Sequence, residues 1–321
     1  MHVVTCFEPP VSHARVADRV RPPLRVALVQ HRWQADGDAL RAELSAGIAK
    51  AAELGAKAVF LPEITLSQYP AFVRGGENPC ADAEDLATGP TFTFAAKAAI
   101  EHGVFVHASL YEGADQGDGL GFNTAILVSP TGELVGRTRK LHIPISAGYY
   151  EDTYFRAGPA NEESYRPHAH PDLGDVRIGM PTCWDEWFPE VARLYSLAGA
   201  DLIVYPTAIG SEPSFPAFDT QPLWQHVIVG NGITSGTFMV VPNRFGDEGE
   251  INFYGSSFIS DPYGRILVQA PRDEFAVLVA DLDLDQRRDW LELFPFLDTR
   301  RPDTYARLTA PVDHEHPFGR P

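Results

Sequence analysis

The sequence predicts an α/β domain, because short apolar segments typical of strands alternate with amphipathic segments typical of helices along most of the chain. The first pair shows the pattern. Residues 26–30 form an apolar run, and Leu40, Leu44 and Ile48 then recur at the four-residue spacing of one helix face. A Ser-Pro-Thr-Gly turn signal at 129–132 lies between two further apolar runs and predicts a hairpin. We therefore expect mixed sheets covered by helices.

The remaining elements follow the same scheme. Strands are expected at 58–62, 104–110, 123–128, 133–138, 202–206 and 238–242, together with one that ends at residue 182. Helices are expected at 94–100, 189–198 and 221–233, and a second hairpin turn at 261–264. Because no linker rich in Pro, Gly or Ser divides the chain, we expect one domain over residues 24–306, with an N-terminal extension at 1–23 and a C-terminal tail at 307–321.

The composition limits the classes of partner. Of the 321 residues 44% are hydrophobic, which is enough for a sizeable core. The formal net charge of −17 would repel nucleic acid and anionic membrane surfaces, so we expect neither as a partner. The same balance is compatible with a cationic small-molecule substrate.

The cysteines and the apolar runs indicate where the protein works. Cys6, Cys80 and Cys183 lie far apart and cannot form a closed disulfide framework, so we expect reduced thiols. The first residues lack the pattern of a signal peptide, and no run of eighteen apolar residues predicts a transmembrane helix. We expect a soluble, cytoplasmic protein.

Cys183 is the strongest candidate for chemistry. An apolar run ends just before it, and Pro189 marks the start of a helix a few residues later. A cysteine on such a strand-to-helix turn projects into a cleft near free backbone N–H groups. The positive end of the helix dipole is expected to lower the pKa of its thiol. A lone cysteine is more often a buried apolar residue, but the Trp-Asp-Glu-Trp that follows is poor material for a core.

Three segments in one order resemble the nitrilase superfamily of carbon–nitrogen hydrolases: A-V-F-L-P-E at 58–63, G-R-T-R-K-L-H-I-P at 136–144 and C-W-D-E-W-F-P-E at 183–190. Further similar segments lie at 149–158, 200–210, 240–246, 254–264 and 300–305, so that the resemblance covers roughly residues 24–306. It is closest to the N-carbamoylputrescine amidase and β-ureidopropionase branches. The resemblance implies a four-layer αββα sandwich with two mixed sheets face to face.

The resemblance also implies the catalytic residues. Cys183 would be the nucleophile, Glu63 the base and acid, and Lys140 the cation that stabilises the oxyanion. Glu151 corresponds to a second glutamate of the carbamoyl-amidase branches, with Asp152 as the alternative in that segment. The family needs no metal and no organic cofactor, and it commonly forms homodimers or larger homo-oligomers.

Aromatic residues are the candidates for substrate binding. Tyr69, Trp187 and Tyr154 would line the mouth of the site, and the backbone N–H of Trp184 would be a second oxyanion donor. The segment at 225–233 departs from the putrescine branch, which leaves the substrate open. The preferred reaction is hydrolysis of an N-carbamoyl amine to an amine, CO2 and NH3. The alternatives are an N-carbamoyl amino acid hydrolase, such as a β-ureidopropionase, and a linear-amide amidase.

Three other interpretations are weighed against this one. A Cys–His pair would use His142 or His226, but nothing around either histidine marks it as catalytic. A true nitrilase typically has Trp-Glu-Asn after the cysteine, whereas Trp-Asp-Glu stands here, and a non-catalytic scaffold would have lost one of the three catalytic residue types. The His-Glu-His of the tail at 314–316 lacks the ligand spacing of a helical or finger-type metal site.

Overall fold

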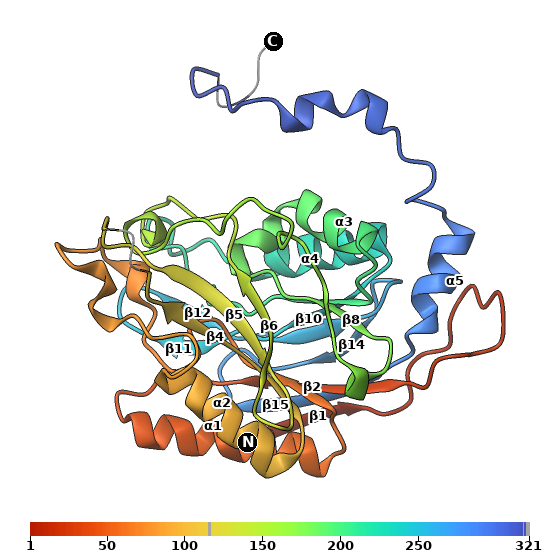
Figure 1. The fold of residues 1–321 in the computed structure, drawn as a ribbon, viewed down its shortest axis with the longest axis horizontal. Coiled ribbons are helices and arrows are strands. Elements are labelled where there is room, and N and C mark those ends of the chain that lie inside the picture. The colour runs from red at the N-terminus through yellow and green to blue at the C-terminus, as the bar shows by residue number, and fades with distance from the viewer. Residues whose placement is uncertain (115–116, 317, 319–321) are drawn as a thin grey trace.

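The computed structural model describes residues 1–114, 117–316 and 318. Two mixed β-sheets pack face to face, and helices cover the outer face of each (Figure 1). Helices α1 and α2 lie on the larger sheet, and α3 and α4 lie on the smaller one (Figure 1). The expected four-layer αββα arrangement is confirmed.

The larger sheet has seven strands. In spatial order they are β1 (His2–Cys6), β15 (Ala276–Leu282), β2 (Leu24–Gln30), β3 (Ala58–Phe60), β4 (Phe105–Glu112), β5 (Phe122–Val128) and β6 (Leu134–Arg139). β2, β3 and β4 run parallel, and β4, β5 and β6 form antiparallel pairs.

The smaller sheet has six strands. In spatial order they are β14 (Ile266–Gln269), β13 (Phe258–Ser260), β10 (Phe238–Val241), β9 (Leu202–Val204), β8 (Arg177–Gly179) and β7 (His168–Ala169). A separate hairpin pairs β11 (Phe245–Asp247) with β12 (Asn252–Tyr254). The helices are α1 (Gly37–Glu53), α2 (Pro90–His102), α3 (Pro189–Leu197), α4 (Gln221–Ser235) and α5 (Asp285–Leu293).

The period-two pattern of β2 explains how the layers are assembled. Val26 and Leu28 point into the cluster between the two sheets, whereas Ala27 and Val29 point to the opposite face. There they meet the apolar face of α1 that was predicted from its four-residue spacing. Both faces of this strand are buried, as is usual for a strand inside a layered α/β fold.

The N-terminal segment is more closely attached than its sequence suggests. Residues 2–6 form β1, which pairs in parallel with β15 at the edge of the larger sheet. Residues 12–21 then run along α5, where their arginines meet buried aspartates. The sequence analysis placed both parts in an extension, because an edge strand of five residues followed by prolines carries little periodicity.

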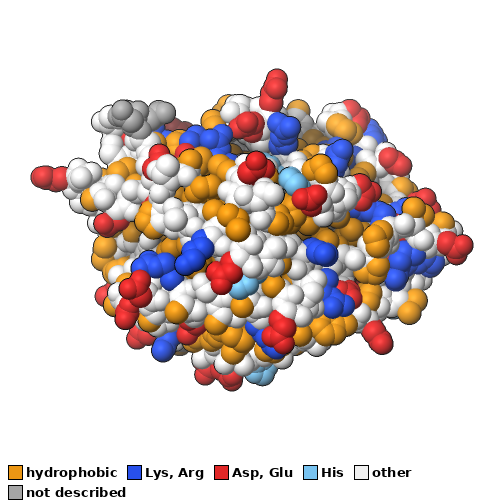
Figure 2. Space-filling model, turned by 60° about the horizontal axis from the view of Figure 1, so that its bottom comes forward, with side chains coloured by type: hydrophobic (Ala, Val, Ile, Leu, Met, Phe, Trp, Pro, Cys, Tyr) orange, Lys and Arg blue, Asp and Glu red, His pale blue; other side chains and the backbone are white. Residues whose placement is uncertain are grey.

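The chain leaves the body after α5. Two short 3-10 turns, Pro302–Thr304 and Ala306–Thr309, lie on an arm that projects away from the sheets (Figure 1). Over the described residues, no helix is both long enough and apolar enough to cross a membrane. Acidic, basic and apolar side chains are interspersed over the face of the molecule seen in Figure 2.

Candidate active site

The predicted catalytic residues follow the carboxyl ends of three strands. Glu63 comes three residues after β3, Lys140 directly follows β6, and Cys183 comes four residues after β8. The larger sheet supplies the first two and the smaller sheet supplies the third, so the site lies where the two sheets meet. All three side chains are buried, with Cys183 the most accessible at 7%.

Lys140 is the centre of a buried hydrogen-bond network. Its Nζ lies 3.0 Å from Glu63 Oε1, and 2.9 and 2.7 Å from the two carboxyl oxygens of Glu151. Asn123 Nδ2 donates to Glu63 Oε1 at 2.7 Å, and the Tyr69 hydroxyl donates to Glu151 Oε1 at 2.8 Å. The structure therefore brings Glu63, Lys140 and Glu151 together, as the resemblance implied.

The charges of this network depend on one another. Burial alone would lower the pKa of Lys140, but the carboxylates of Glu151 and Glu63 outweigh it and hold that pKa well above its ordinary value. Two carboxyl groups thus share one ammonium group. Burial, together with the neighbouring Glu63, raises the pKa of Glu151 to about 7 although Lys140 opposes this. Lys140 is therefore a fixed buried cation at neutral pH.

Cys183 occupies a strained position at the start of a 3-10 turn that spans Cys183–Trp187. Its φ of 42° lies in the left-handed region, which is unusual for a residue with a side chain. The backbone N–H of Cys183 donates to Pro206 O at 3.0 Å. Thr182 N and His142 N each donate to the Asp185 carboxyl group at 3.0 Å, which ties the turn to the residue before it and to the segment after Lys140. Such strain is retained where the surrounding contacts determine the backbone.

The expected effect on the Cys183 thiol was wrong in sign. Burial and the negative charge of Glu63 raise the pKa of Cys183 well above its ordinary value, and Lys140 lowers it by less. Helix α3 begins only at Pro189, after the 3-10 turn, so its dipole is not directed at the sulfur. The resting thiol is neutral and needs a base when it reacts.

Glu63 is the residue that the sequence analysis predicted as this base, and its charge acts on Cys183. Its Oε1 is used by Lys140 and Asn123, whereas its buried Oε2 has no hydrogen-bond partner among the described residues. Arg244, itself fully buried, donates to the backbone oxygens of Glu63 and Ile64 at 2.8 and 2.7 Å. The backbone that carries Glu63 is thus held, while one of its carboxyl oxygens is left to exchange a proton.

Neither histidine forms a Cys–His pair. His142 Nδ1 lies 2.7 Å from Asp185 Oδ1, and its ring stacks on Phe188 at 3.9 Å. His226 is exposed on α4. The charged groups that act most strongly on Cys183 are glutamates and Lys140 instead.

Three residues of the site were missed by the sequence analysis. Asn123 and Arg244 support Glu63, and Glu186 lies fully buried in the turn of Cys183. A signal for Arg244 was present, since the polar pair Asn243-Arg244 directly after the apolar run 238–242 is unusual for a core. In the segment after Lys140, it is Glu151 that contacts the ammonium group, and no Asp152–Lys140 ion pair is formed.

The aromatic candidates occupy different places. Tyr69 belongs to the network itself through Glu151. Trp184 and Trp187 are half-buried in the Cys183 turn with ring centroids 6.2 Å apart. The ring centroids of Tyr154 and Tyr111 lie 6.4 Å apart, and both rings belong to the same apolar cluster as Tyr69. Their roles toward a substrate therefore remain predictions.

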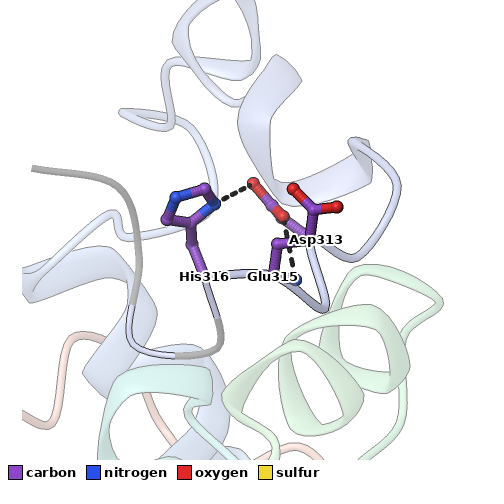
Figure 3. A group of neighbouring side chains, drawn as sticks. All are labelled: Asp313, Glu315 and His316. Carbon is purple, nitrogen blue, oxygen red and sulfur yellow. Dashed lines mark hydrogen bonds and ion pairs between the residues drawn. The ribbon is translucent and has the colours of Figure 1, made fainter.

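The C-terminal arm contains a small group of possible metal ligands (Figure 3). The Asp313 carboxyl group lies 3.2 Å from His316 Nδ1 and accepts from the backbone N–H of Glu315 at 3.2 Å. Glu315 and His316 are exposed to solvent. The carboxyl group already has local partners, and nothing else marks the group as a metal site.

The four-layer fold with its site between the two sheets is that of the nitrilase superfamily. The crystal structure of a carbon–nitrogen hydrolase from Helicobacter pylori G27 superposes with a TM-score of 0.78 at 27% identity, over 91% of this chain and 100% of that one. A family profile described as carbon–nitrogen hydrolase matches residues 25–292, and the chain belongs to this family of hydrolases that act on C–N bonds other than peptide bonds.

Two curated relatives are similar to most of this chain. A citrullinase of Francisella tularensis is 32% identical over 293 residues, which are 89% of this chain and 98% of the relative. An N-carbamoylputrescine amidase of Arabidopsis thaliana is 35% identical over 234 residues, which are 70% of this chain and 75% of the relative. An amidase from Nesterenkonia has the same fold, with a TM-score of 0.67 at 22% identity over 90% of this chain and 98% of the other.

Proposed function

We propose that this hydrolase cleaves the carbamoyl group of an N-carbamoyl amine, with Cys183 as nucleophile. The observation that carries the proposal is the buried set of Glu63, Lys140 and Glu151 beside a neutral thiol. The set combines an acceptor for the thiol proton with a fixed cation for a developing oxyanion.

The reaction proceeds in two halves. Glu63 accepts the thiol proton while Cys183 Sγ bonds to the carbamoyl carbon, and Glu63 then gives a proton to the departing nitrogen, which leaves as NH3. The product of this half is a thioester-like carbamoyl enzyme. Water then attacks the same carbon and loses a proton to Glu63, which returns one to the sulfur as the C–S bond breaks. The released carbamic acid decomposes to the amine and CO2.

The oxyanion formed in each half needs donors. The Lys140 ammonium group is one, and the backbone N–H of Trp184 is the other. The N–H of Cys183 is already used by Pro206 O at 3.0 Å, whereas no backbone acceptor takes the N–H of Trp184 among the described residues. Glu151 supports Lys140 by keeping it charged and oriented at 2.7 Å.

The proposed substrate class rests on Glu212, a further carboxyl group near the site. Glu212, on the loop after β9, is half-buried, and no cation of the described residues pairs with it. The backbone oxygen of Ser211, next to Glu212, accepts from the Tyr149 hydroxyl at 3.3 Å, and the Tyr149 ring centroid lies 6.1 Å from that of Tyr69 in the Lys140 network. A distal ammonium group of the substrate would pair with Glu212, as the N-carbamoylputrescine amidase relatives suggest.

L-Citrulline is a second candidate. It is an N-carbamoyl amine whose far end carries both an ammonium and a carboxylate group, and the citrullinase relative covers more of this chain than the N-carbamoylputrescine amidase does. Glu212 would pair with its ammonium group and repel its carboxylate. We therefore rank N-carbamoylputrescine first.

A substrate panel tests the proposal. N-carbamoylputrescine, L-citrulline, N-carbamoyl-β-alanine, a simple aliphatic amide and a nitrile are each incubated with the enzyme, and ammonia release is measured. We expect the highest kcat/KM for N-carbamoylputrescine, with a lead over N-carbamoyl-β-alanine that narrows as salt screens Glu212. Cys183→Ala should abolish turnover and leave the fold intact.

Glu212→Gln separates substrate charge from catalysis. We expect it to lower kcat/KM for N-carbamoylputrescine and to leave that for the uncharged amide unchanged. A preference for N-carbamoyl-β-alanine, or equal effects of Glu212→Gln on the charged and uncharged substrates, would refute the cationic substrate. The nucleophile and its network would stand in that case.

We also propose that the protein forms a homodimer or larger homo-oligomer. Helices α3 and α4 pack side by side and expose Leu194, Leu197 and Leu223 by 39%, 42% and 50%. Residues of the projecting arm hydrogen-bond to one another, as between Arg301 N and the Tyr305 hydroxyl at 3.1 Å. A second copy would cover these apolar side chains. Sedimentation should give at least twice the 35.3 kDa of one chain.

A further inference from the structure

Glu186 is a fully buried carboxyl group in the turn that carries Cys183, and the reaction proposed above does not use it. Trp224 Nε1 donates to its Oε1 at 2.7 Å, and Asn231 Nδ2 donates to its backbone oxygen at 2.9 Å. Trp224 and Asn231 lie seven residues apart on α4, which places them on one face of that helix. Both the side chain and the backbone of Glu186 thus fasten the turn to α4.

The contacts of Thr207 indicate where a proton lies. Thr207 Oγ1 is 2.8 Å from Tyr205 O and 3.3 Å from Glu186 Oε2. A hydroxyl group has one hydrogen, and a carbonyl oxygen can only accept, so the hydrogen of Thr207 goes to Tyr205 O. The contact with Glu186 then needs a hydrogen on the carboxyl group. A protonated Glu186 satisfies every contact that its side chain makes.

The surroundings favour the same protonation state. Among the described residues no cation forms an ion pair with Glu186, and Lys140 is bound by Glu63 and Glu151. Burial raises the pKa of Glu186 well above its ordinary value, with Glu63 adding to this and Trp224, Thr207 and Lys140 opposing it. The other titratable groups that face it are the sulfur of Cys183 and the hydroxyls of Tyr205 and Tyr254.

We propose that Glu186 is a neutral positioning residue, which holds the strained Cys183 turn against α4 without adding a negative charge beside the reacting sulfur. The proposal rests on the nucleophilic role proposed for Cys183. An ionised Glu186 would oppose formation of the thiolate, as Glu63 already does. An apolar residue in its place would leave Trp224 Nε1 without its acceptor and the turn without its anchor.

Two substitutions at this position test the proposal. Glu186→Gln has the shape of the neutral acid, since its oxygen accepts from Trp224 and its amide donates to Thr207. We expect it to retain wild-type kcat and KM. Glu186→Ala should lower kcat by about 10²-fold, the cost of misplacing a reacting group by about 1 Å, with little change in KM. Glu63→Gln is the matched control, because the same change at a carboxyl group that must exchange protons should lower kcat by at least about 10²-fold.

The rate of Cys183 alkylation by iodoacetamide, measured against pH, needs no substrate. We expect the profile of Glu186→Gln to superimpose on that of the wild type, because no charge is removed. A shift of the Glu186→Gln profile toward lower pH, or a loss of activity equal to that of Glu63→Gln, would show an ionised Glu186 and overturn the proposal. Should Glu186→Ala fail to fold, the glutamine variant alone decides. The alkylation result does not depend on the substrate, so the proposal about Glu186 can be tested even if the proposed N-carbamoyl amine substrate is wrong.

Discussion

At the scale of single residues, the site is defined by an imbalance of buried charge. Two carboxyl groups, Glu63 and Glu151, contact one ammonium group, that of Lys140. In the proposed reaction, an anion arising at the substrate carbonyl would meet this cation, whereas the thiolate would form next to Glu63. Proton transfer from the thiol to Glu63 removes that conflict, because it moves the negative charge instead of adding a second one. The arrangement therefore favours a thiolate that forms only as it attacks.

Substitutions in this network should cost far more than substitutions at the histidines. We expect Glu63→Gln and Lys140→Ala each to lower kcat/KM by at least about 10²-fold, as for loss of an acid–base group or an oxyanion donor. His142→Ala and His226→Ala should cost much less. Steady-state kinetics with the best substrate of the panel measures all four. Lys50→Ala, at an exposed ion pair on α1, is the control for loss of a lysine.

If a histidine variant lost its activity while Lys140→Ala kept nearly normal kcat/KM, a Cys–His pair would replace this mechanism.

The sequence predicted Glu63, Lys140 and Glu151, but neither their partner Asn123 nor the electrostatics of the site. Motifs and their order indicate which residues meet, and here Glu63, Lys140 and Glu151 do meet. The pKa of Cys183 depends on burial by neighbours from both sheets, which no spacing within a motif reveals.

At the scale of elements, the sequence predicts a helix or strand best where one face of the element is buried, or where a residue such as Pro or Gly marks its end. The helix predicted at 189–198 is α3, and Pro189 marks its start in both descriptions. The helix predicted at 221–233 is α4, which ends at Gly236 in the left-handed conformation. The hairpin β11–β12 was missed, because its strands of three residues are too short to show a period.

Strand β4 supports a prediction about acid stability. His107 on this strand is fully buried, and burial lowers its pKa to about 3, with nearby His168 acting in the same direction. Between about pH 3 and the pKa of about 6.5 expected in the unfolded chain, His107 is protonated in the unfolded protein but neutral in the folded protein. The free energy of unfolding must therefore decrease as the pH is lowered through this window, by about 1.4 kcal/mol per pH unit for this group.

We expect His107→Leu to remove that part of the slope, whatever its effect on stability at neutral pH. Urea unfolding at several pH values between 4 and 7 measures it. His226→Leu replaces an exposed histidine on α4 and should leave the slope unchanged. Equal slopes for His107→Leu and the wild type would mean that His107 is not buried in its neutral form.

At the scale of the whole molecule, the N-terminal segment joins parts of the chain that are far apart in sequence. Residues 1–23 lie before the part matched by the family profile, yet they add β1 to the larger sheet and then run along α5. Arg15 contacts both Asp283 and Asp289, whose side chains are fully buried. Arg19 lies 2.9 Å from Asp283, and Ser12 donates to Asp289 at 2.7 Å. The segment thus supplies the two arginines that pair with Asp283, and it shares Asp289 with Arg288 of α5, which lies 2.9 Å from that carboxyl group.

Arg15→Ala should destabilise the protein, because it takes one cation from two buried carboxyl groups at once. Breaking a buried pair from one side costs about 3–5 kcal/mol, and we expect less because Arg19 and Arg288 still pair with the two aspartates. The Arg15 side chain is also 28% exposed and screened by water. Arg301→Ala is the control, since its pair with Asp303 is exposed to solvent and should contribute little to stability. Urea unfolding compares the two, and limited proteolysis reports whether residues 7–23 detach first. Equal losses in the two variants, with no new cleavage before residue 24, would show that the segment lies on the surface without stabilising α5.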